Sequence, residues 1–137
     1  MTDASSPKRH LAIWFPYLAA DRLRQQEPDR IAQRPKRQSS APPDAALVFV
    51  AKQKNALRLA AVDAAAQALG LAPGMALADA RVRVPGLIAV ETDAAADRHW
   101  LELLARSCTR FSPHVVPHPP DAIAIDIAGC EHLWGGE

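Results

Sequence analysis

Residues 110–136 read RFSPHVVPHPPDAIAIDIAGCEHLWGG, and the elements within this stretch decide the fold. The segment AIAIDIAG predicts a short final strand, because β-branched residues bounded by turn residues are typical of strands. Before it, SPHVVPHPP (residues 112–120) predicts an extended connection stiffened by proline. After it, CEHLWGGE (residues 130–137) predicts a turn or a short helix. We therefore expect one sheet strand, with an extended connection before it and a turn or short helix after it.

Two carboxylates bracket this strand, Asp121 at its start and Asp126 at its end. Because they are five residues apart, their side chains point to opposite faces of a sheet. Two-metal phosphoryl transfer needs carboxylates that converge on cations about 4 Å apart. Asp121 would therefore need partners from a neighbouring strand. The expected neighbour is LAIWF, residues 11–15, which brings Trp14 and Phe15 in their place.

The N-terminal part of the chain predicts a strand, a helix, a loop and a hairpin. LAIWF is typical of a short buried strand that ends at Pro16, since proline cannot donate to a strand ladder. Residues 17–26 have apolar side chains at helical spacing and predict a helix. Residues 27–44, rich in Pro, Ser and Arg, predict a loop or disordered segment. Residues 45–62 then predict two strands joined by a turn near Lys54.

The remaining middle of the chain predicts three helices and one strand. Residues 63–81 predict two short helices, the first capped by Asp63 and ended at Gly70. LIAV, residues 87–90, predicts another buried strand. Residues 93–111 predict the longest helix. We expect its apolar face to be formed by Trp100, Leu103, Leu104 and Cys108.

Composition and charge narrow the class of protein. The chain is 49% hydrophobic and 23% charged, which is typical of a soluble globular protein, and no apolar run approaches the roughly 20 residues of a membrane span. The N-terminus carries no apolar signal core, so we expect a cytoplasmic protein without a membrane partner and with two reduced cysteines. Residues 1–58 hold 11 Lys/Arg against 5 Asp/Glu, a net charge of +6, whereas residues 59–137 hold 5 against 10, a net charge of −5. The basic half suits an anionic partner such as nucleic acid, and an ordinary solvated surface is the alternative.

Motifs for metal and phosphate binding are not recognisable. The CEH at residues 130–132, with one Cys and one His elsewhere, matches no familiar zinc-ligand spacing, so we expect core packing for Cys108. The five histidines form no HExxH pattern, and we expect them in loops or at the surface. LGLAPG lacks the glycine spacing that aims backbone N–H groups at phosphates.

The order of these pieces resembles the N-terminal palm and fingers of Y-family (UmuC/DinB-like) translesion DNA polymerases. LGLAPGMALADAR is similar to a fingers stretch of that family, and RFSPHVVPHPPDAIAIDIAGCEHLWGG is similar to the stretch that closes its active site. The beginning LAIWFP and the segment RLAAVDAAAQALGL resemble the ImuB-type branch in particular. The resemblance implies an α+β fold, a truncated palm-like sheet with helices and a small fingers subdomain. Residues 1–9 would be a disordered N-terminus and 10–137 the UmuC-like region. This region divides into a partial palm at 10–17 and 86–137 and a fingers-like part at 18–85, with a flexible basic loop at 28–45.

Position by position, the resemblance implies a degenerate catalytic site. The two metal-binding aspartates of the first strand fall at Trp14 and Pro16, and the Asp-Glu pair of the closing motif falls at Asp121 and Ala122. Mg²⁺ requires oxygen ligands, which Trp and Pro side chains do not offer, and their bulk would fill the cavity. We therefore expect no metal and no cofactor.

The nucleotide-contacting positions are degenerate as well. The tyrosine and arginine that contact the incoming triphosphate in the family fall at Ala64 and Gln67. The bulky residue that excludes ribonucleotides falls near Ala19. Neither of the two triphosphate contacts is therefore present.

The resemblance implies a non-catalytic accessory factor in DNA repair, translesion synthesis and damage-induced (SOS) mutagenesis. Such proteins act with an error-prone replicative-type polymerase, the sliding clamp and RecA, through parts expected beyond Glu137. One alternative is an active error-prone polymerase that recruits Mg²⁺ with carboxylates such as Asp63 or Asp126. Another is a truncated piece that acts only as an interaction module.

Basic side chains of the fingers-like part are the candidate DNA contacts. Lys52, Lys54 and Arg58 cluster at the predicted hairpin, and the preceding loop adds Arg34, Lys36 and Arg37. We expect salt-sensitive contacts with the DNA backbone rather than recognition of bases.

Overall fold

The structure is a computed structural model that describes residues 8–32, 45–133 and 135. The chain forms two compact units of mixed α/β architecture. Unit 1 consists of Met1–Pro16 and Ala95–Glu137, and unit 2 consists of Tyr17–Ala94.

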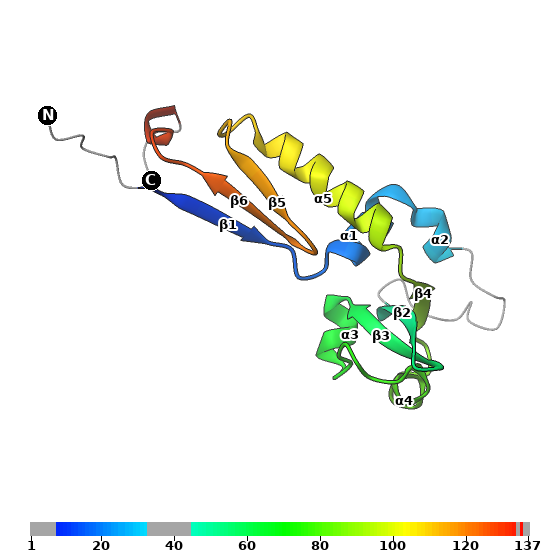
Figure 1. Cartoon of the computed structure of the whole chain (residues 1–137). Helices are drawn as coiled ribbons and strands as arrows, with labels where there is room; N and C mark the ends of the chain where they lie inside the picture. Colours follow the sequence, from blue (N-terminus) through cyan, green and yellow to red (C-terminus); the bar gives the residue numbers. More distant parts are fainter. Residues whose placement is uncertain (1–7, 33–44, 134, 136–137) are drawn as a thin grey trace, which may run out of the picture. The chain divides into compact units, whose positions relative to one another are not determined.

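Unit 1 is built on a three-stranded antiparallel sheet in the order β1-β6-β5 (Figure 1). Its strands are β1 (His10–Trp14), β5 (Val115–His118) and β6 (Ala122–Asp126). Strand β1 pairs with β6, so the neighbour expected for the last strand is confirmed. A short 3-10 helix at Glu131–Leu133 follows, as the sequence predicts.

Strand β5 shows that part of the extended connection predicted over residues 112–120 is a paired strand. Val115–His118 pairs with β6, with Pro117 opposite Ile123. A proline within a strand is tolerated where the strand lies at a sheet edge, because its missing N–H is not needed there. The strand order places β5 at such an edge.

Strand β1 is not buried, contrary to the expectation for LAIWF. Leu11 is 48% exposed and Trp14 68% exposed. The buried residues of the sheet are Ile123 and Ile125 of the central strand β6. Side chains of a strand alternate between two faces, and a sheet covered on one face buries only every second residue.

Helix α5 (Ala94–Cys108) runs alongside this sheet in Figure 1. Its fully buried residues are Leu101 and Ala105, one helical turn apart. The expected face of Trp100, Leu103, Leu104 and Cys108 is only half-buried, and the two fully buried residues were not among those expected. The helix is amphipathic as predicted, but its buried stripe is rotated.

Unit 2 contains a mixed three-stranded sheet in the order β3-β2-β4. Strands β2 (Leu47–Gln53) and β3 (Ala56–Val62) form the predicted antiparallel hairpin. Lys54 and Asn55 make the turn with positive φ, which suits the tight connection of two twisted strands. Strand β4 (Ile88–Glu91) runs parallel to β2.

The pairing of β4 shifts the expected boundary between the two parts of the chain. Residues 86–94 were expected with the palm-like part, whereas β4 belongs to the sheet of unit 2. A parallel strand joins its sheet through long-range backbone bonds, which no local pattern reveals.

The helices of unit 2 are α1 (Leu18–Gln26), α2 (Pro28–Ala32), α3 (Ala64–Ala68) and α4 (Leu77–Arg83). Helix α2 corrects the loop expected over residues 27–44, of which 33–44 lie outside the described part. A proline at the first helical position is compatible with a helix because its missing N–H would be unpaired there anyway. Glu27 accepts hydrogen bonds from Arg30 and Arg22 beside it, and these guanidinium groups lower the pKa of Glu27.

The core of unit 2 lies on both faces of its sheet. On one face Leu47 and Phe49 pack with Ala20 and Leu23 of α1. On the other face the strands pack against α3 and α4, through Val48, Val50, Leu59, Ala66, Leu77 and Ala80. Within the described residues, no helix is long and apolar enough to cross a membrane.

Candidate functional site

Trp14 and Asp121 meet where β1 ends and β6 begins. The register places Trp14 opposite Ala122, the residue after Asp121. The Trp14 indole Nε1 donates a hydrogen bond to Asp121 Oδ2 at 3.1 Å, and the backbone N–H of Phe15 donates to the Asp121 carbonyl at 2.8 Å. The two segments expected to form one site are therefore adjacent in the fold.

The Trp14 ring does not fill a cavity, contrary to the expectation from its bulk. It is 68% exposed, and Pro16 is exposed as well. The indole N–H finds a carboxylate at the sheet surface, and this bond holds the ring there rather than in a core.

These residues do not fit a Mg²⁺ site. Mg²⁺ takes oxygen ligands in near-octahedral geometry. Trp14, Pro16 and Ala122 have no side-chain oxygen, and one oxygen of Asp121 already accepts the indole N–H. In the described ranges, no group of three or more His, Cys, Asp or Glu is arranged to hold a metal ion.

The positions expected to contact a triphosphate lie on α3 and carry no cation. Ala64 is exposed and ends in a methyl group. Gln67 accepts a hydrogen bond through Oε1 from the hydroxyl of Tyr17. This bond ties the start of α1 to α3, and neither side chain offers a positive charge for phosphates.

Asp63 is buried, and both of its carboxylate oxygens accept hydrogen bonds within unit 2. It is 1% exposed, its Oδ1 accepts the N–H of Ala66 at 2.8 Å, and its Oδ2 accepts from Arg24 Nη2 at 2.6 Å. The helix cap expected at Asp63 is thus confirmed. The pairing with Arg24 was not expected from the sequence, because the two residues lie 39 positions apart.

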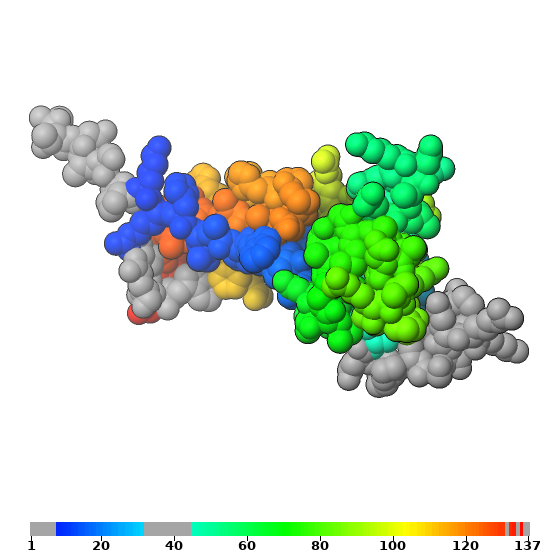
Figure 2. All heavy atoms as spheres, turned by 90° about the horizontal axis from the view of Figure 1, so that it is seen from below, coloured from blue at the N-terminus to red at the C-terminus, as the bar shows by residue number. Residues whose placement is uncertain are grey.

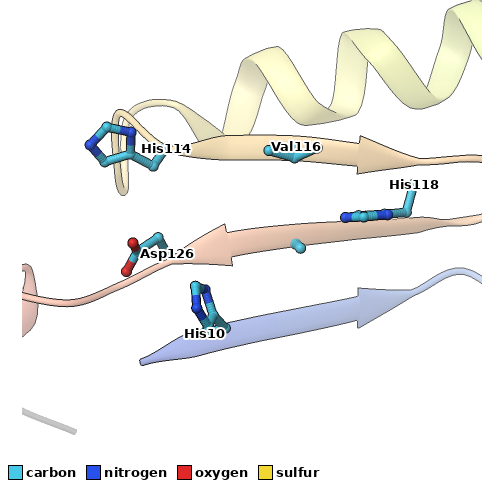
Figure 3. Close-up of a pocket in the computed structure, with 6 residues that line it drawn as sticks. His10, His114, Val116, His118 and Asp126 are labelled. Atoms are coloured by element: carbon cyan, nitrogen blue, oxygen red, sulfur yellow. The ribbon is translucent and has the colours of Figure 1, made fainter. Parts of the chain in front are cut away.

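The outer face of the sheet in unit 1 carries a group of residues that the sequence did not bring together. They line an open concavity of about 450 Å³ (Figure 3): His10, His114, Val116, His118, Ala124 and Asp126. His10 is paired across the strands with Asp126, whose Oδ1 accepts the N–H of Ala128 at 3.0 Å. The period-two spacing of His114, Val116 and His118 is the signal that could have revealed this face.

The candidate DNA-contacting residues lie on the β2–β3 hairpin of unit 2, which reaches the surface in Figure 2. Lys52 and Lys54 are exposed. Arg58 is half-buried, and its Nη1 donates to the Gly74 carbonyl at 2.9 Å, so it also supports a neighbouring loop. Arg34, Lys36 and Arg37 lie outside the described residues.

Comparison with known proteins gives one family match and one type of relative. The model described as the impB/mucB/samB family matches residues 42–137. Protein ImuB of Caulobacter vibrioides (strain NA1000 / CB15N) is 49% identical over 69 residues, which are 50% of this chain and 15% of that protein.

Solved structures share the fold of this chain. Dbh DNA polymerase in a post-insertion binary complex gives a TM-score of 0.70 at 15% identity, over 88% of this chain and 32% of that one. A Y-family DNA polymerase chimera gives a TM-score of 0.67 at 16% identity, over 86% and 32%. The chain thus spans about a third of these structures, and the mixed α/β, Y-family polymerase-like fold expected from the sequence is confirmed.

Proposed function

The chain belongs to the impB/mucB/samB family, and from this premise we propose that it is a non-catalytic, Y-family polymerase-like accessory factor. Its role is in DNA repair and translesion synthesis, as part of damage-induced (SOS) mutagenesis. The similarity to Protein ImuB and the polymerase-like fold support a polymerase-like role linked to DNA damage. The proposed lack of polymerase activity rests mainly on the hydrogen bond between Trp14 and Asp121.

Phosphoryl transfer by a polymerase depends on metal ions that hold the triphosphate and neutralise its charge. An indole and a pyrrolidine ring stand where the resemblance implies metal-binding aspartates, and Asp121 accepts a hydrogen bond from that indole. Ala64 and Gln67 supply no positive charge for the phosphates. The chain therefore retains a polymerase-like framework without the groups that perform the reaction.

A primer-extension assay tests this proposal. The full-length protein is incubated with a primed template, deoxynucleoside triphosphates and Mg²⁺, and we expect no incorporation. Asp121→Ala is the matched variant, and we expect it to give the same result as the unaltered chain. Mg²⁺-dependent incorporation that Asp121→Ala abolishes would overturn the non-catalytic assignment.

The alternative of an active enzyme names two further carboxylates, Asp126 and Asp63. Asp126 lies five residues from Asp121 along an extended strand, roughly 17 Å away at about 3.4 Å per residue. Asp63 is buried, caps α3 and is paired with Arg24. Asp126 is therefore too far from Asp121 to share a metal ion with it, and both oxygens of Asp63 already accept hydrogen bonds.

We propose DNA as the direct partner of this chain, through exposed basic side chains at the β2–β3 hairpin. The sliding clamp, RecA and a separate error-prone polymerase are partners of the whole protein, and the resemblance to ImuB-type proteins supports them. Co-purification of the full-length protein with each of the three measures these contacts. Recovery of none of them would contradict this part of the proposal.

A further inference from the structure

The outer face of the β1-β6-β5 sheet, opposite to the face of the buried Ile123 and Ile125, carries three rows of side chains across its strands. Residues directly opposite one another in antiparallel strands lie on the same face and form such rows. The first row consists of His10, Asp126 and His114, whose carbonyl accepts the N–H of Asp126 at 2.9 Å. The second row consists of Ala12, Ala124 and Val116, and the third of Trp14, Ala122 and His118.

The second row forms the floor of an apolar trough. Two of its three side chains are single methyl groups, whereas larger imidazole, carboxylate and indole groups lie in the rows on either side. The concavity of about 450 Å³ lies over Ala124 and Val116 (Figure 3). Val116 is 53% exposed, and Ala12 is exposed as well. Aliphatic side chains of a ligand would therefore find an apolar surface here.

The three rows contain carboxylate but no Lys or Arg. Asp126 lies in the first row, and Asp121 lies beside the third, where it accepts the Trp14 N–H at 3.1 Å. A carboxylate has about four lone-pair sites, so both can accept further donors besides Trp14 and the N–H of Ala128. The charge of this face therefore favours a cationic ligand over an anionic one.

Trp14 offers a surface for a cation at the third row. It is 68% exposed, and the hydrogen bond from its Nε1 to Asp121 fixes the orientation of the ring. The face of an indole is the most favourable aromatic partner for a Lys or Arg cation, and a guanidinium group also stacks flat on it. Because a carboxylate lies at the edge of the same ring, Trp14 and Asp121 together suit an Arg side chain.

We propose that this outer face binds a basic peptide segment of a partner protein, with an Arg or Lys over Trp14 and aliphatic side chains in the trough. The carboxylates attract the basic groups, and the apolar floor of Ala12, Ala124 and Val116 accepts the aliphatic ones. This inference goes beyond the proposed function, because it assigns a protein-binding site to unit 1 in addition to the DNA contacts proposed for unit 2.

The test measures binding of fluorescein-labelled peptides to the full-length protein by fluorescence anisotropy. The probe is a peptide of about ten residues with Arg and Val in equal numbers, and in the control peptide Glu replaces each Arg. We expect the Arg/Val peptide to bind more tightly than the Glu/Val peptide. Trp14→Leu should weaken its binding at least about fivefold, and Asp126→Asn at least about threefold. Asp79→Asn removes the same charge from an exposed position of α4 and should leave the affinity unchanged.

Asp126→Asn keeps an oxygen for the N–H of Ala128, so it tests the charge without depending on the folding of Trp14→Leu. Peptide affinity that neither variant changes, or equal binding of the two peptides, would overturn the peptide site and leave the DNA-binding function intact. Neither variant should weaken binding of a primed template. A parallel loss of DNA affinity would make this face a nucleic-acid site and contradict the proposal, as would self-association of the unaltered protein that Trp14→Leu abolishes.

Discussion

Trp14 shows how one residue can change the chemistry of a whole site. The Y-family resemblance places a metal-binding aspartate at this position, and the structure has an indole that donates a hydrogen bond to Asp121. That position 14 offers no side-chain oxygen to a metal ion follows from residue identity alone. That the ring lies open to solvent does not, because exposure depends on which sheet face the strand presents.

Asp63 is a buried polar residue of unit 2 whose removal should be costly. Asp63→Ala removes the cap of α3 and leaves Arg24 without this partner, so we expect the free energy of unfolding to fall by about 1–3 kcal/mol. Asp63→Asn keeps an oxygen for the cap and should cost less. Urea denaturation measures both.

Asp79→Ala is a control for a different acidic residue, one in the exposed first turn of α4. We expect it to change stability by less than about 0.5 kcal/mol. If Asp63→Ala were no more destabilising than Asp79→Ala, Asp63 would not have the structural role assigned to it.

At the scale of elements, helix α5 illustrates a pattern that predicts a helix but not its buried stripe. Apolar residues occur around much of the helix, so several faces were compatible with the sequence. The structure buries Leu101 and Ala105 and leaves Trp100 and Leu103 half-buried. Which apolar stripe is buried depends on the packing of the helix with the rest of its unit.

The two leucines Leu101 and Leu103 test the corrected face of α5. Leu101→Ala removes a fully buried side chain and should lower the free energy of unfolding by about 2–5 kcal/mol. Leu103→Ala is the same change at a half-buried position and should cost clearly less. Thermal or urea unfolding followed by circular dichroism compares the two, and equal losses would contradict the assigned face.

At the scale of the whole molecule, the uneven charge is a property that the sequence makes visible at once. The first 58 residues carry a net charge of +6 and the remainder −5. In unit 2 the exposed Lys52 and Lys54 add to this positive charge at the β2–β3 hairpin. A region of net positive charge attracts an anionic chain such as DNA.

Salt dependence tests the contribution of the hairpin to DNA binding. Lys52→Ala/Lys54→Ala should weaken binding of a primed template and reduce the slope of log K against log salt by up to about 2, one for each lost phosphate contact. Arg81→Ala/Arg98→Ala removes two exposed charges from α4 and α5 and should change the slope less. Equal slopes for the two double variants would argue against a specific role of the hairpin.

Local sequence patterns predicted most element types, the neighbour of the last strand, the turn at Lys54, the cap at Asp63 and the lack of side-chain oxygens suited to Mg²⁺ at Trp14 and Pro16. These features depend on local patterns and on the chemistry of single side chains. Four features became visible in the folded chain: β5 is a strand, β4 joins the sheet of unit 2, Arg24 pairs with Asp63 and Trp14 is exposed. Each of these features depends on contacts between residues far apart in the chain, and short-range spacing in a sequence does not record such contacts.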